Sequence, residues 1–107
     1  MERSDLSVVT SHGSAEAVVT LAGEIEMSTV QVLARAIDEI LGAEVPPRIV
    51  VDLSGVTFCD SQGLGTLVVL TRRVAMAHSC FILVNAGDFL LRVFDITGLR
   101  GALTIKN

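Results

Sequence analysis

The segment of residues 56–65, Val-Thr-Phe-Cys-Asp-Ser-Gln-Gly-Leu-Gly, restricts the fold most strongly, because a buried strand meets a helix there across a very short turn. The β-branched run Ile49-Val50-Val51 before it is typical of a strand buried on both faces, as in a parallel sheet. Asp60 is placed to cap the helix, which we expect to run from Ser61 to about Ala77. This succession is typical of α/β domains, in which helices cover a mostly parallel sheet.

The rest of the chain repeats this alternation of strands and helices. The expected strands cover residues 6–10, 17–21, 48–53, 81–84 and 103–105, and the expected helices cover residues 28–41, 61–77 and 88–97. The expected end signals are a Ser28-x-x-Gln31 capping box, Asp88 as a helix cap, and Gly23, Gly42 and Gly98 at the ends of elements. The order β-β-α-β-α-β-α-β predicts one domain over residues 1–107, with an antiparallel hairpin at its start.

Ser61 is the main candidate functional residue. It lies at the carboxyl end of a strand, where functional groups collect in parallel sheets. A helix start carries free N–H groups and a positive partial charge, so it is a natural place to hold a phosphate. Ser61 could be a nucleophile, a phosphate-binding residue, a phosphate acceptor or a plain solvated serine. Gly63 and Gly65 nearby indicate either a contact surface or tight packing of the helix on a strand.

Catalysis by a serine or cysteine nucleophile is disfavoured. A nucleophilic Ser61 needs a general base, and the sequence offers only His12 and His78. His78 lies roughly 25 Å away along the same expected helix, and His12 lies in a turn after the first strand. Neither the Gly-x-Ser-x-Gly elbow nor the Gly-x-x-x-x-Gly-Lys phosphate loop is present, and we expect no cofactor.

Metal chemistry has equally little support in the sequence. Cys59 and Cys80 lack metal-ligand spacing, and we interpret them as small hydrophobic residues, with a regulatory disulfide as the alternative. Glu24 and Glu26 flank Ile25, and we expect them on a solvated loop rather than in a metal or acid–base site. We therefore expect no metal.

Charge and hydropathy argue against a protein that binds nucleic acid and against one that binds or crosses a membrane. The net charge of −4 argues against a nucleic-acid binder and against a polybasic membrane-surface module. The longest apolar run, residues 67–70, is far shorter than the roughly 20 residues that span a bilayer. The first residues, Met-Glu-Arg-Ser-Asp, have no apolar signal core behind them, so we expect a cytoplasmic protein.

The second helix carries more apolar surface than one buried face needs. The residues expected on its inner face are Leu64, Leu67, Val68, Thr71, Val74 and Ala75. Val69, Leu70 and Met76 extend the apolar stripe beyond that face. An exposed apolar patch usually marks a partner site, and this one would lie on the helix that carries Ser61.

Four segments, taken in order, resemble the successive signatures of STAS domains, most closely those of the bacterial anti-sigma factor antagonists. They are Leu21-Ala22-Gly23-Glu24-Ile25, Val50-Val51-Asp52-Leu53-Ser54-Gly55-Val56, Asp60-Ser61-Gln62-Gly63-Leu64-Gly65 and Ile96-Thr97-Gly98-Leu99. The resemblance implies the STAS fold, an α/β fold with a mixed, mostly parallel sheet of four to five strands and about three main helices. It also implies a regulatory switch without catalytic activity.

In that family the unmodified antagonist binds an anti-sigma factor, often a serine kinase with a GHKL-type ATP site, and so frees the sigma factor. The kinase phosphorylates the serine after the motif aspartate, here Ser61, and a PP2C-type phosphatase removes the phosphate. We expect a monomer or weak dimer. The expected partner-binding residues are Glu24, Glu26, Asp60, Ser61, Gln62, Gly63, Leu64, Gly65 and Val69.

Two positions depart from the family pattern. Glu26 stands where an aspartate is frequent, which bears on partner choice, and Gln62 stands where a second hydroxyl residue often follows the acceptor. Ser61 is therefore expected to be the single phosphorylation site of the motif. Two alternatives stay open, a non-phosphorylated STAS interaction subunit, for example of a lipid-transport complex, and a small hydrolase using Ser61 or Cys59.

Overall fold

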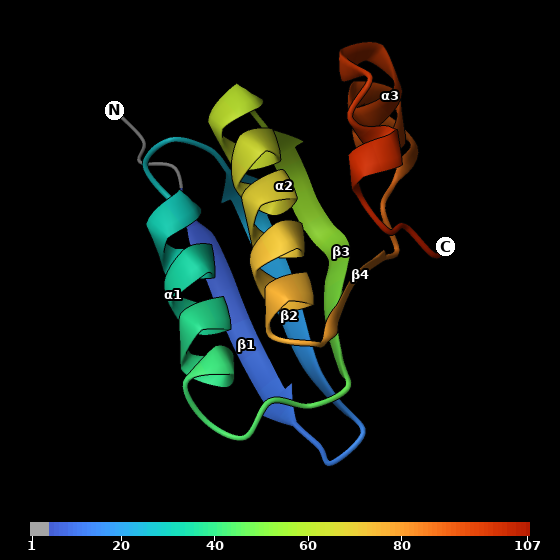
Figure 1. Cartoon of the computed structure of the whole chain (residues 1–107). Coiled ribbons are helices and arrows are strands. Elements are labelled where there is room, and N and C mark those ends of the chain that lie inside the picture. The colour runs from blue at the N-terminus through green and yellow to red at the C-terminus, as the bar shows by residue number, and fades with distance from the viewer. Residues whose placement is uncertain (1–4) are drawn as a thin grey trace.

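A four-stranded sheet with two helices packed across one of its faces forms the body of the computed structural model, which describes residues 5–107 (Figure 1). A third helix lies beyond the far edge strand. The elements in chain order are β1 (Leu6–His12), β2 (Glu16–Ile25), α1 (Val30–Leu41), β3 (Arg48–Cys59), α2 (Ser61–Met76), β4 (Cys80–Val84), α3 (Asp88–Thr97) and a 3₁₀ turn (Arg100–Ala102). The expectation that the first residues of the chain do not begin a signal segment concerns mainly residues 1–4, which lie outside the described part.

The strands lie in the order β1-β2-β3-β4. The β1–β2 pair is antiparallel, and the β2–β3 and β3–β4 pairs are parallel, so the mixed, mostly parallel sheet is confirmed. The prediction that Gly23 ends β2 is wrong, because the strand continues to Ile25. Gly23 has a φ of +117°, and a Cβ built there would lie 2.2 Å from the carbonyl oxygen of Asp5, so only glycine lets the strand pass this point.

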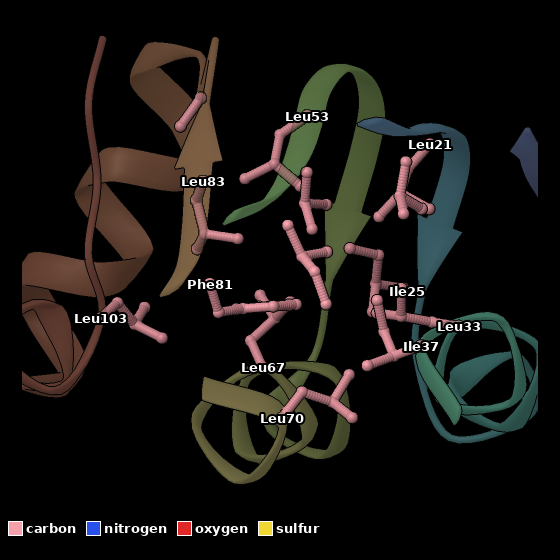
Figure 2. Close-up of a cluster of buried hydrophobic side chains, with 14 of the residues drawn as sticks. Leu21, Ile25, Leu33, Ile37, Leu53, Leu67, Leu70, Phe81, Leu83 and Leu103 are labelled. Atoms are coloured by element: carbon pink, nitrogen blue, oxygen red, sulfur yellow. The ribbon is translucent and has the colours of Figure 1, made fainter. Parts of the chain in front are cut away.

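The core lies between the sheet and helices α1 and α2, which both turn apolar side chains toward it (Figure 2). Leu33 and Ile37 of α1 and Leu67 and Leu70 of α2 point into one cluster with the inward residues of the strands. The fully buried large side chains are Leu21, Ile25, Leu33, Ile37, Ile40, Ile49, Leu53, Leu64, Leu67, Leu70, Leu83 and Phe94. Packing of this kind fixes the helix α2, and with it Ser61, on the sheet.

The prediction that Val69, Leu70 and Met76 lie outside the buried face of α2 is partly right. Val69 and Met76 are 58% and 82% exposed, as expected of residues outside the buried face. Leu70 is buried in the core, so its assignment to the outer stripe is wrong. Ala75, predicted on the inner face, is exposed. Leu70 is buried because α1 packs beside α2 and widens the buried face of that helix.

Two helix starts differ from the prediction. Thr29, rather than Ser28, is the N-cap of α1, and no side chain caps that helix. The Thr29 hydroxyl instead donates to the carbonyl of Glu24 at 2.7 Å and accepts the N–H of Glu26 at 3.0 Å. Asp88 is the first residue of α3 rather than its cap, whereas Gly98 ends that helix with a φ of +72°, as expected.

The predicted last strand, residues 103–105, does not form. The chain makes the 3₁₀ turn Arg100–Ala102 and then a single parallel bridge between Ile105 and Leu83. Leu83 donates its N–H to Thr104 at 2.8 Å and accepts the N–H of Lys106 at 2.9 Å. The end of the described chain therefore lies along the outer edge of β4 without becoming a fifth strand.

Candidate functional site

Ser61 is exposed and is the first residue of α2, directly after the carboxyl end of β3. The carboxylate of Asp60 caps the helix, since its Oδ1 accepts the N–H of Gly63 at 2.8 Å. The N–H of Asp60 donates to the carbonyl of Ile25 at 3.1 Å, which holds the turn against the end of β2. The predicted cap is confirmed, and it holds the backbone of Ser61 at the helix start.

The same carboxylate also holds a second segment. Its Oδ2 accepts the N–H of Met27 at 3.2 Å and so ties the loop between β2 and α1 to the start of α2. Within that loop the Glu26 carboxylate accepts the N–H of Ser28 at 3.0 Å and the Ser28 hydroxyl. Met27 itself is 70% exposed. Asp60 and Glu26 therefore both shape the loop beside Ser61. The bond between Met27 and Asp60 spans 33 residues of sequence, so sequence spacing does not indicate it.

The expected partner-binding residues divide into exposed and buried groups. Glu24 is half-buried within β2, paired with Phe58 of β3, so its expected place on a solvated loop is wrong; Glu26 does lie in a loop. Gln62 is exposed. Gly63 and Leu64 are buried and face the sheet, so they position the helix.

Gly63 and Gly65 have different surroundings. A Cβ on Gly63 would lie 2.4 Å from the carbonyl oxygen of Ile25, so tight packing of α2 on β2 requires glycine there. A Cβ on Gly65 would meet nothing within 4 Å. The fold therefore explains the first glycine, and it leaves Gly65 as part of an open surface.

An open groove of about 450 Å³ begins beside Ser61 and runs between α1 and α2. Arg73 pairs with Asp38 of α1 at 2.7 Å and so bridges the two helices. The groove is lined by Ala34, Gln62, Gly65, Thr66, Val69, Leu70 and Arg73. Three of the expected partner-binding residues, Gln62, Gly65 and Val69, therefore line this groove, which is more apolar than polar.

Asp60→Ala is expected to lower the free energy of unfolding by about 1–2 kcal/mol, because the N–H groups of Gly63 and Met27 both lose their acceptor. Asp60→Asn is the matched control, since it keeps one side-chain oxygen and should lose less. Urea unfolding followed by circular dichroism measures both. Equal stability of Asp60→Ala and the unaltered protein would contradict this role of the carboxylate.

Neither histidine is placed to activate Ser61. His12 is paired with Ala17, which is paired with Ile49 at the start of β3, whereas Ser61 follows the end of that strand, about 30 Å away. His78 lies beyond the opposite end of α2. Over residues 5–107 no group of three potential metal ligands comes together. The geometry gives no support to the hydrolase alternative.

The two cysteines lie at opposite ends of the sheet, so the predicted alternative of an internal disulfide is wrong. Cys59 ends β3, whereas Cys80 is paired with Arg48 at its start. Eleven residues of strand separate those positions by roughly 36 Å, and a disulfide needs Cα atoms within about 7 Å. The structure gives both thiols as free.

Burial, helped by the negative charge of Asp60, raises the pKa of the Cys59 thiol to about 11. We therefore expect iodoacetamide at about pH 8 to alkylate the exposed Cys80 and to spare Cys59 until the protein unfolds. The stability linked to Cys59 is fully present below the ordinary thiol pKa of 9.0 and is lost as the pH rises through about 11. Peptide mass spectrometry measures the labelling, and equal labelling of both thiols in the folded protein would contradict the expectation.

Fold and site together define a small α/β domain that presents one capped, exposed serine beside an apolar groove. A family model described as "Mlab, STAS domain" matches residues 8–105. The anti-sigma-B factor antagonist of Listeria monocytogenes is 33% identical over 89 residues, which cover 83% of this chain and 77% of that protein. The chain belongs to the STAS domain family, and relatives in Listeria and Mycobacterium are named anti-sigma factor antagonists.

Solved structures agree with this assignment. An anti-sigma factor antagonist from Mycobacterium paratuberculosis, 29% identical, superposes with a TM-score of 0.81 over 94% of this chain and 85% of its own. The Bacillus protein SpoIIAA, 20% identical, has the same fold in its phosphorylated form, with a TM-score of 0.70 over 94% of this chain and 92% of its own. No helix within residues 5–107 has the length and apolar character needed to cross a bilayer.

Proposed function

We propose that this chain is an anti-sigma factor antagonist that binds its anti-sigma factor while Ser61 is unmodified and releases it when Ser61 is phosphorylated. The observation that carries the proposal is the exposed Ser61 at the start of α2, held by the Asp60 cap beside an open groove. The names of the relatives in Listeria and Mycobacterium support the choice of partner. An anti-sigma factor that is itself a serine kinase would supply the phosphate.

The proposed contact surface combines the site loop with the outer side of α2. Gly65 belongs to it because nothing in the fold fills the space above that residue, and Val69 because it is exposed on the wall of the groove. The carboxylates of Glu26, in the loop after β2, and of Asp60, at the helix cap, make this edge of the surface acidic. Glu24 alternates with the core residue Ile25 in β2 and so turns to the other face of the sheet. A fitting anti-sigma factor would fill the groove with an apolar projection and would place no free basic side chain over the Ser61 hydroxyl.

Phosphorylation would change this surface more than it changes the fold. A phosphoserine carries about −1.5 to −2 charges, which the helix start favours by roughly 0.3–1 kcal/mol. The neighbouring Asp60 opposes that gain, so the net effect on folding stability is small. A partner that fits the unmodified serine would instead have to bury a phosphate dianion with no opposite charge beside it. That burial costs far more than one contact contributes. The phosphate therefore acts at the interface.

The direct test is to incubate the protein with ATP and the candidate serine kinases of the same cell, and to map the product by mass spectrometry. A single phosphate on Ser61, absent from Ser61→Ala and removed by a PP2C-type phosphatase, is the expected result. A kinase that modified other hydroxyls equally well would count against the proposal. Failure of every kinase to modify Ser61 would favour the alternative of a non-phosphorylated STAS subunit, such as one of a lipid-transport complex.

A further inference from the structure

Among residues 5–107, no strand pairs with the outer side of β1, and residues 6–12 lack the charges, prolines and bulges that proteins use to keep such edges apart. Residues 6–12 contain no lysine, arginine, aspartate, glutamate or proline, and the β1–β2 register runs without a bulge. We propose that β1 is the contact strand of a symmetric dimer, in which two copies of this chain pair antiparallel along β1 and form one continuous sheet.

The hydrogen bonds of the hairpin show which backbone groups are free for this pairing. The N–H of Glu24 donates to the carbonyl of Asp5 at 2.9 Å, which makes Asp5 and Glu24 a hydrogen-bonded pair. Hydrogen-bonded and non-hydrogen-bonded pairs alternate along an antiparallel ladder, so every second residue of β1 bonds to β2. The remaining residues turn their N–H and C=O groups toward the open edge; these are Leu6, Val8, Thr10 and His12.

A two-fold axis through Val9 satisfies all of these outward groups at once. Leu6 then pairs with the partner's His12, and Val8 pairs with the partner's Thr10, each pair exchanging two backbone hydrogen bonds. The two Val9 residues face each other as a non-hydrogen-bonded pair with Cα atoms about 4.5 Å apart. Val9 is 62% exposed, so the pairing also covers an apolar side chain that the monomer leaves in water.

Charges on helix α1 indicate that the partner paired along β1 is a second copy of this chain. Val8 and Thr10 line a hollow of about 240 Å³ together with residues on one side of α1, namely Val32, Arg35, Ala36 and Glu39. The two-fold axis sets the two α1 helices antiparallel, with Arg35 and the partner's Glu39 within about one helical turn along the helices. Neither residue belongs to the three ion pairs found over residues 5–107. The surface is therefore complementary to itself in charge and in backbone pattern.

Sedimentation velocity over micromolar to millimolar protein concentrations tests the proposal. The unaltered protein should pass from monomer to dimer as its concentration rises. Thr10→Pro removes an outward N–H without removing a bond to β2, and it should weaken self-association roughly tenfold or more. Arg35→Glu should weaken it by like-charge contact, and the double variant Arg35→Glu/Glu39→Arg should restore it. Circular dichroism confirms that each variant is folded.

Amide hydrogen exchange distinguishes this strand from any other contact. The amides of Val8 and Thr10 should become protected as the protein concentration rises, whereas those of Val9 and Ser11, already bonded within the hairpin, should not change. An unaltered protein that stays monomeric throughout the series would overturn the proposal. So would a folded Thr10→Pro or Arg35→Glu variant that dimerises like the unaltered chain.

Discussion

Ser61→Asp is expected to weaken binding to the anti-sigma factor by about 100-fold or more, which corresponds to about 2.7 kcal/mol. The substitution puts a second carboxylate beside Asp60 at the centre of the proposed surface, where the partner would have to cover it without a matching charge. Ser61→Ala removes only the hydroxyl and should bind as tightly as the unmodified protein. Isothermal titration calorimetry with the purified anti-sigma factor measures both constants.

Ser14→Asp is the matched control for charge. Ser14 is exposed in the turn between β1 and β2, at the opposite end of the sheet, so the same net charge is added far from the site. Its affinity should equal that of the unaltered protein. If Ser61→Asp bound as tightly as Ser61→Ala, charge at this position would not be the switch.

Gly63→Ala is expected to destabilise the protein by about 2 kcal/mol. The new methyl group would lie 2.4 Å from the carbonyl oxygen of Ile25 and 2.9 Å from its Cγ2, so α2 must move away from β2. Overpacking of this kind costs about 1–3 kcal/mol, and a backbone oxygen yields less readily than a side chain. Replacing a helical glycine returns about 1 kcal/mol at most, which does not offset the clash. Thermal unfolding should show a lower Tm.

Gly65→Ala is the control two residues later in the same helix. Nothing lies within 4 Å of its added methyl group, so the substitution should stabilise the protein by about 0.5–1 kcal/mol. The same methyl group enters the groove and should weaken partner binding if Gly65 belongs to the contact surface. A destabilising Gly65→Ala, or a neutral Gly63→Ala, would contradict the packing described for α2.

Local signals in the sequence predicted the centre of the site well. A β-branched strand followed by Asp60 and Ser61 placed the cap, the start of α2 and the exposed hydroxyl where the structure has them. Ser28 failed as a cap signal because its hydroxyl donates to the Glu26 carboxylate, and α1 begins after Thr29 without a side-chain cap. The local partners of a hydroxyl side chain therefore decide whether it caps a helix.

Contacts between distant segments could not be predicted. The link between Asp60 and Met27, the packing of Ile25 on Gly63 and the burial of Leu70 under α1 all depend on how strands and helices meet in space. The last strand failed for the same reason. Residues 103–105 have strand-forming character, but the turn at Arg100–Ala102 leaves only Ile105 paired with β4.

The account is tested most directly by measuring how tightly one preparation of the protein binds its anti-sigma factor before and after stoichiometric phosphorylation of Ser61. The predicted result is a loss of affinity of about 100-fold or more on phosphorylation, recovery after phosphatase treatment, and little change in the circular dichroism spectrum or the Tm. Equal affinity of the phosphorylated and unmodified forms would contradict the central claim that the charge on Ser61 controls the interface.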